Sequence, residues 1–125
     1  MAHIEGIKRM IDRQQEEAKK SEVRKQKELE SLFAERARVH LKITGKVQGV
    51  FFRSFVEKVA NDLQLAGYVK NQEDGSVEVV AEGEKPALEE LIKECKRGPS
   101  WAAIEDVNVI WEEYKGEFGN FEVRS

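Results

Sequence analysis

The segment from Gly45 to Arg53, which reads GKVQGVFFR, joins two stretches whose hydrophobic residues recur with different periods. Before it, Val39, Leu41 and Ile43 alternate with polar residues, which is the period of two that a half-buried strand shows. After it, apolar residues recur at spacings of three and four, which indicates an amphipathic helix. These residues are Phe52, Phe55, Val56, Val59, Ala60 and Leu63. The segment is therefore predicted to be a glycine-containing loop between a strand and the start of a helix.

A loop of this kind gathers backbone N–H groups that have no partner inside the following helix. Those donors, together with the positive end of the helix dipole, suit a phosphate group. Arg53 adds a guanidinium at the end of the loop, and guanidinium groups bind phosphate through two parallel hydrogen bonds. Taken alone, the segment leaves two interpretations open, a phosphate-binding loop or an ordinary turn followed by a solvated arginine.

The sequence beyond this loop continues to alternate between strand-like and helix-like segments. In chain order, the predicted elements are a strand over about 37–46, a helix over about 53–65, a strand from Tyr68 to the Asp74-Gly75 turn, a strand over 76–81, a helix over 86–97, a strand around 107–112 and a short strand carrying Phe121 and Val123. Gly67 is expected to end the first of these helices as a left-handed cap. This order predicts an α+β, ferredoxin-like βαββαβ fold with a short terminal strand, in which two helices cover one face of an antiparallel sheet.

Residues 1–35 have a different composition from the rest of the chain. They are rich in Glu, Lys, Arg and Gln, with eight basic and eight acidic side chains, and this composition favours helix. We therefore expect a charged helical extension over 1–35 before a domain over 36–125. Two interpretations of the extension stay open. It is either a solvated helix or a helix that self-associates through apolar residues near its ends, namely Ile4, Ile7, Ile11 and Leu32.

The composition excludes several classes of function. The chain holds 21 basic and 24 acidic residues, so its net charge of −3 provides no general attraction for nucleic acid or anionic lipid. No apolar run reaches membrane-spanning length, and a cytoplasmic location is expected. Cys95 is the only cysteine, which rules out a disulfide within the chain, and it is expected to be buried on a helix face. His3 and His40 have no partners at ligand spacing, so no metal is expected.

A second segment, Gly67–Glu78, reads GYVKNQEDGSVE. The two segments together, in this order, resemble the acylphosphatase family, whose pattern is G-x-V-Q-G-V-x-F-R followed by G-[WY]-V-x-N-x-x-D-G-x-V-E. The resemblance covers about residues 37–125. It implies a ferredoxin-like fold and a hydrolase that splits acyl phosphates, which are carboxyl–phosphate anhydrides, into a carboxylate and inorganic phosphate without a cofactor.

The resemblance also assigns roles to particular residues. It implies that phosphate is held by the guanidinium of Arg53 and by the backbone of six consecutive residues, namely Gln48, Gly49, Val50, Phe51, Phe52 and Arg53. It implies that Asn71 positions the attacking water, so Arg53 and Asn71 are the candidate catalytic residues. The side chain of Phe51 is expected to pack beside the loop.

Other functions remain to be weighed against hydrolysis. The main alternative is a non-catalytic anion-binding or partner-binding module with this fold, although pure binding does not need Asn71. A second alternative is an accessory domain that handles carbamoyl phosphate within a larger enzyme. An RNA-binding domain of the same topology would carry stacking aromatics on its central strands, and the first strand offers His40, Lys42 and Thr44 instead.

Overall fold

The computed structural model describes residues 15, 18–26 and 34–125. The chain divides into two compact units, Met1–Ala34 and Glu35–Ser125. In the first unit, residues 15 and 18–26 are helical, which confirms a helix in the N-terminal extension. The four apolar residues proposed for self-association lie outside the described residues, so that hypothesis stays a prediction.

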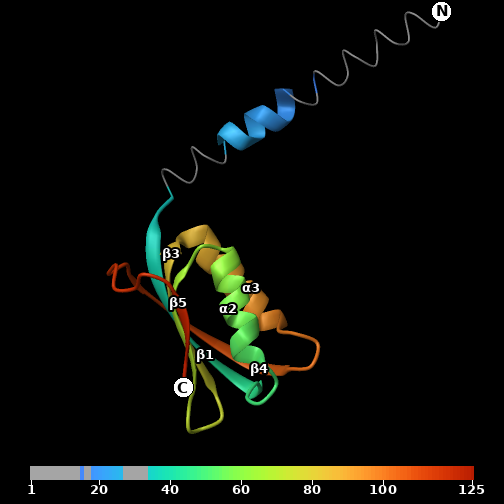
Figure 1. The fold of residues 1–125 in the computed structure, drawn as a ribbon, viewed down its shortest axis with the longest axis vertical. Coiled ribbons are helices and arrows are strands. Elements are labelled where there is room, and N and C mark those ends of the chain that lie inside the picture. The colour runs from blue at the N-terminus through green and yellow to red at the C-terminus, as the bar shows by residue number, and fades with distance from the viewer. Residues whose placement is uncertain (1–14, 16–17, 27–33) are drawn as a thin grey trace, which may run out of the picture. The chain divides into compact units, whose positions relative to one another are not determined.

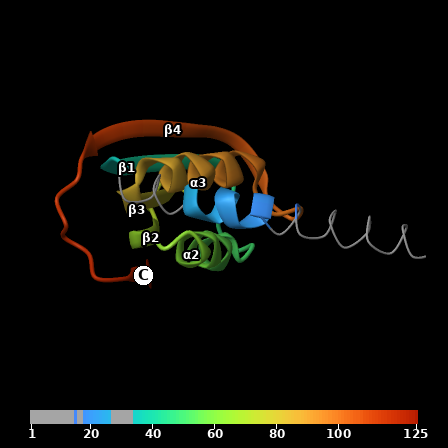
Figure 2. The ribbon, with the colours of Figure 1, turned by 90° about the horizontal axis from the view of Figure 1, so that it is seen from above.

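The second unit contains five strands and two helices. They are β1 (Arg36–Lys46), α2 (Phe52–Asp62), β2 (Ala66–Asn71), β3 (Val77–Glu84), α3 (Lys85–Arg97), β4 (Ala103–Glu113) and β5 (Phe121–Arg124). The strands form one sheet in the order β4-β1-β3-β2-β5, and α2 and α3 lie beside each other against it (Figures 1 and 2). The predicted ferredoxin-like fold is confirmed, with one difference. Since β5 runs parallel to β2 while the other neighbours are antiparallel, the sheet is mixed.

The core lies between the sheet and the two helices. Val39, Leu41 and Ile43 of β1 are fully buried, whereas the intervening side chains face the opposite side of the sheet, as the period of two predicts. The helices contribute the matching apolar face. Their buried residues are Phe52, Val56, Ala60, Leu88, Leu91, Ile92 and Cys95. Burial of each large side chain contributes about 1.5–3 kcal/mol, so this layer fixes α2 against the sheet.

The first helix ends earlier than the sequence suggests. α2 ends at Asp62, and the residue with the left-handed backbone after it is Gln64 (φ 58°), so the prediction that Gly67 caps the helix is wrong. Gly67 belongs to β2 instead, with φ 143°. A Cβ at this position would lie 1.9 Å from the carbonyl oxygen of Val80. The glycine is needed because β3 passes too close for any side chain.

The second helix matches its prediction closely. Pro86 occupies the first turn of α3, where its missing N–H costs nothing, and Gly98 (φ 65°) follows the last residue. Cys95 is buried on the inner face of this helix, as expected from the sequence. Burial, with a smaller contribution from Glu94, raises the pKa of the Cys95 thiol to about 12.

The thiol of Cys95 is therefore expected to be unreactive in the folded protein, because only a thiolate attacks disulfide reagents and no solvent path reaches this one. We expect no labelling by 5,5′-dithiobis(2-nitrobenzoate) at pH 8 and one equivalent after unfolding in guanidinium chloride. Labelling of the folded protein at the rate of a free thiol would contradict the packing described for α3.

A buried carboxylate fixes the segment that leads to β5. Glu82 is 3% exposed on the face of the sheet opposite the helices. Its two oxygens accept hydrogen bonds from the backbone N–H groups of Lys115, Gly116 and Glu117 at 2.6–3.2 Å. These contacts hold the connection after β4 against β3, and β5 then pairs with β2 from Gly67 onward. The anchor thereby delivers the C-terminal end of the chain to the end of the sheet where α2 begins (Figure 1).

Among the described strands, β4 forms one edge of the sheet and pairs with β1 alone. It is eleven residues long and carries exposed apolar side chains at Ile110 and Trp111. Four acidic residues interrupt this strand, namely Glu105, Asp106, Glu112 and Glu113.

No helix among the described residues is both long and apolar enough to cross a membrane.

Candidate active site

The segment Gln48–Arg53, called the candidate phosphate loop below, connects β1 to α2. None of its six backbone N–H groups donates a hydrogen bond to a backbone carbonyl of the described residues. The backbone is left-handed at Gly49 (φ 72°) and at Phe51 (φ 59°), and Val50 between them is not. Loops in which left-handed residues alternate with others can present successive N–H groups to an anion. The predicted collection of free donors before a helix is therefore present.

Arg53 is the second residue of α2 and stands at the start of that helix. One of its terminal nitrogens, Nη1, donates a hydrogen bond to the backbone carbonyl of Arg124 at 3.0 Å. The guanidinium offers further N–H groups beyond that one bond. The contact with β5 holds the side chain beside the loop, where the N-terminal end of the helix also favours an anion.

Asn71 is the last residue of β2 and pairs with Val77 on β3. Its side-chain oxygen Oδ1 is buried and accepts no hydrogen bond from any described residue. Buried polar atoms are almost always paired, and an unpaired one has a cost of about 1–3 kcal/mol. An unpaired buried acceptor of this kind therefore calls for a specific explanation.

A single hollow of about 310 Å³ brings these groups together. Its walls come from the candidate phosphate loop, the start of α2, the end of β2 and β5. The lining residues are Val47, Gly49, Phe51, Phe52, Arg53, Ser54, Asn71 and Val123. Arg53 and Asn71 are 18 positions apart in the sequence, and the fold places them in one cavity of a size that suits a phosphate with part of its substituent.

Comparisons with known proteins identify the family. The sequence profile of the family described as acylphosphatase matches residues 39–123. A protein named acylphosphatase from Pyrobaculum arsenaticum is 50% identical over 90 residues, covering 71% of this chain and 95% of the relative. The chain belongs to the acylphosphatase family.

Solved structures agree with this assignment. An acylphosphatase from Coxiella burnetii is 41% identical, with a TM-score of 0.68, and the match covers 72% of this chain and 94% of that one. The structure of full-length HypF in its phosphate- and nucleotide-bound form is 31% identical with a TM-score of 0.68, and the match covers 74% of this chain and 12% of HypF. Hydrolysis of acyl phosphates, the activity predicted from the sequence, is the activity that membership in the family supports.

The turn between β2 and β3 follows Asn71 directly. Asp74 accepts a hydrogen bond from the Ser76 N–H at 3.0 Å and pairs with the Lys42 ammonium at 2.8 Å. The Lys42 ammonium, followed by the Ser76 donors, holds the pKa of the Asp74 carboxyl well below its usual range. Because that pKa is depressed, the ion pair is present at neutral pH and is lost only as the pH falls through the lowered value. The turn following Asn71 is therefore held from the β1 side at working pH.

The side chain of Gln48 has a role that its sequence position did not reveal. The resemblance assigned only its backbone to phosphate binding. In the structure, its side-chain amide Nε2 donates hydrogen bonds to the carbonyls of Gln72 and Ser76, each at 2.8 Å. Both partners are acceptors, so the NH₂ end of the amide must face them. No local pattern signals this contact, because the partners lie 24 and 28 residues away.

The expectation that Phe51 packs beside the loop is wrong. Its side chain is 79% exposed, although it lines the rim of the hollow. The left-handed backbone at this residue directs the side chain outward, and for a non-glycine residue that conformation has a cost of roughly 1–3 kcal/mol. Val123 of β5 lines the same hollow and is also exposed, so the rim carries apolar groups from both the loop and the last strand.

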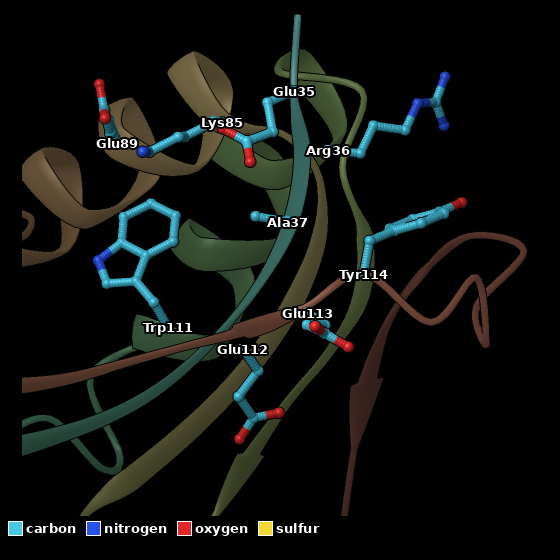
Figure 3. A pocket seen from close by; sticks show the side chains of 9 residues that line it. All are labelled: Glu35, Arg36, Ala37, Lys85, Glu89, Trp111, Glu112, Glu113 and Tyr114. Atoms are coloured by element: carbon cyan, nitrogen blue, oxygen red, sulfur yellow. The ribbon is translucent and has the colours of Figure 1, made fainter.

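A larger hollow of about 830 Å³ lies at the other end of β1, beside the start of α3. Figure 3 shows Trp111 and Lys85 on one side of it, with the Glu112 and Arg36 side chains pointing away from Trp111. The Lys85 ammonium lies 5.8 Å from the centre of the Trp111 ring, so this aromatic face already has a cation partner. No predicted site residue lines this hollow, and its acidic side chains Glu35, Glu89, Glu112 and Glu113 are unsuited to a phosphate.

Proposed function

We propose that this acylphosphatase binds the phosphate of its substrate through the N–H groups of the candidate phosphate loop and the Arg53 guanidinium, and that Asn71 positions the attacking water. The observation that carries the proposal is that Asn71, whose side-chain Oδ1 has no hydrogen-bond partner among the described residues, lines the same hollow as Arg53. An acceptor in that position can take a hydrogen bond from one water molecule and so aim its oxygen at a phosphorus atom held in the loop.

The reaction requires little covalent chemistry from the protein. The water oxygen attacks phosphorus, the bond between phosphorus and the acyl oxygen breaks, and the carboxylate leaves with the bonding electron pair. The water proton passes to a phosphate oxygen or to solvent, because the amide of Asn71 is not a base. Charge on the three remaining phosphoryl oxygens is stabilised by the loop donors, the helix dipole and Arg53. A carboxylate is a good leaving group, so the proposal includes no cofactor and no metal.

The acidic field of the domain gives the substrate no long-range attraction, so these local donors must provide the affinity for an anion. The binding-module alternative is disfavoured, because a site that only held phosphate would have no use for the orphan acceptor of Asn71. The match to HypF covers 12% of that longer chain, so a domain of this fold also occurs as one part of a larger protein. This is the observation that favours the accessory-domain alternative.

The residue bounds of the catalytic domain are also part of the proposal. We take residues 36–125 as the catalytic domain and residues 1–35 as an extension outside it. Neither the described residues nor the relatives support self-association through the extension. A cytoplasmic location stays a proposal, and the one buried free thiol is compatible with a reducing compartment.

The proposal is tested by the hydrolysis of benzoyl phosphate by the purified chain in excess EDTA. We expect metal-independent release of benzoate with saturable kinetics, and competitive inhibition by inorganic phosphate because the product occupies the same loop. A folded protein without turnover, checked by circular dichroism, would overturn the assignment of this hollow as an active site.

A further inference from the structure

We infer that Gln48 is a positioning residue whose side chain fixes Asn71 relative to the phosphate loop. The inference rests on the proposed function and adds a component to it. Gln48 does not line the hollow, so its side chain is placed to act on the protein rather than on the substrate.

The two carbonyls that Gln48 contacts flank Asn71 on both strands of its hairpin. Asn71 and Val77 form the last pair in the register of β2 and β3. The next residue on β2 is Gln72 and the preceding residue on β3 is Ser76, and the N–H of Gln72 donates to the carbonyl of Ser76 at 2.9 Å. Gln48 Nε2 reaches the carbonyls of both residues at 2.8 Å. One side chain therefore holds both strands at the step next to Asn71.

The other end of this connection is the candidate phosphate loop itself. Gln48 is its first residue, directly before Gly49, whose backbone is left-handed (φ 72°). The amide of Gln48 thus links the element that holds phosphorus to the element that holds the attacking water. In an in-line displacement, the distance and angle between these two groups set the rate, and a displacement of about 1 Å can cost as much as 10²-fold.

The test replaces Gln48 with methionine, which has nearly the same size and donates no hydrogen bond. For Gln48→Met we expect kcat for benzoyl phosphate to fall roughly 10- to 100-fold. The inhibition constant of inorganic phosphate should stay within about twofold, because the loop donors and Arg53 remain. A parallel loss of phosphate affinity would overturn the inference, since it would mean that Gln48 supports the loop and not Asn71.

A double-mutant cycle separates positioning from general stabilisation. If Gln48 acts through Asn71, Gln48→Met should change kcat by less than about twofold in an Asn71→Ala background. Equal fold losses in both backgrounds would overturn the inference. The matched control is Gln72→Met, which removes the 2.8 Å contact between Gln72 Oε1 and the Ser76 hydroxyl in the same turn but leaves the Gln48 contacts in place. A loss for this control as large as for Gln48→Met would also count against it.

An NMR measurement that does not depend on enzymatic activity tests the role of Gln48 separately from the proposed function. The side-chain NH₂ signals of Asn71 in a ¹H–¹⁵N spectrum can be assigned by their absence in Asn71→Ala. In Gln48→Met, and in Gln48→Glu if the first variant does not fold, these signals should shift or broaden. Unchanged signals would overturn the inference. An inactive wild-type protein whose Asn71 signals still respond to Gln48→Met would instead disprove only the proposed function.

Discussion

Replacement of Arg53 by alanine is expected to lower kcat/KM for benzoyl phosphate by roughly 10²–10³-fold and to abolish competitive inhibition by millimolar phosphate. Among the described residues, Arg53 is the only arginine that lines the hollow, and its guanidinium can hold two phosphate oxygens at once. The loop N–H groups alone would then face a doubly charged substrate in a domain with a net negative charge. Steady-state kinetics and phosphate inhibition measure both effects.

Arg53→Lys is the control for charge. It keeps a positive group at the start of α2 but lacks the planar fork, so we expect partial recovery of phosphate inhibition with a small recovery of kcat. Both variants should unfold at nearly the wild-type temperature, because the side-chain contact that Arg53 makes with the described residues is an exposed hydrogen bond to the Arg124 carbonyl. Full activity of Arg53→Ala would show that the phosphate is bound elsewhere.

Replacement of Asn71 by alanine is expected to lower kcat by roughly 10²–10³-fold while phosphate inhibition changes little. The variant loses the acceptor that aims the water and leaves the phosphate-binding donors intact. It also removes a buried, unpaired oxygen, so the protein should be no less stable than the wild type in urea titration. Loss of activity without loss of stability is the pattern expected of a functional residue.

Asn108→Ala is the matched control for Asn71→Ala. Asn108 is also a strand asparagine, but it lies on β4 beside His40 and Ile110, away from the hollow. We expect unchanged kcat and unchanged phosphate inhibition for this variant. If Asn71→Ala kept full turnover, or if it lost phosphate affinity as completely as Arg53→Ala, the water-positioning role would be wrong.

Local patterns in the sequence predicted the fold well where one face of an element is buried. The alternation around Leu41 and the spacing of Phe52 and Val56 reflect burial directly, and both elements form where expected. The end of α2 and the role of Gly67 were missed because they depend on how closely β3 passes, which is a tertiary contact. The parallel pairing of β5 was also missed because it depends on a tertiary contact. Glu82, which holds the segment before this strand, lies more than 30 residues from its hydrogen-bond partners.

The part of the site that lies within two short sequence motifs, Gly45–Arg53 and Gly67–Glu78, could be predicted from the sequence. The candidate phosphate loop and Asn71 were placed through the family resemblance, and the fold brings Arg53 and Asn71 into one hollow. The orphan oxygen of Asn71, the outward side chain of Phe51 and the double contact of Gln48 could not be read from the sequence. Each depends on side-chain directions that are set only when the loop, the hairpin and β5 meet.

The acidic residues on β4 have a consequence for the behaviour of the protein at high concentration. An unpaired edge strand is a template for the addition of another chain, and repeated addition leads to fibrils. A second copy of β4 in antiparallel pairing would bring the pairs Glu105-Asp106 and Glu112-Glu113 of both chains to the same new seam. Their mutual repulsion makes that seam unfavourable, so the carboxylates of β4 themselves protect this edge of the enzyme against aggregation.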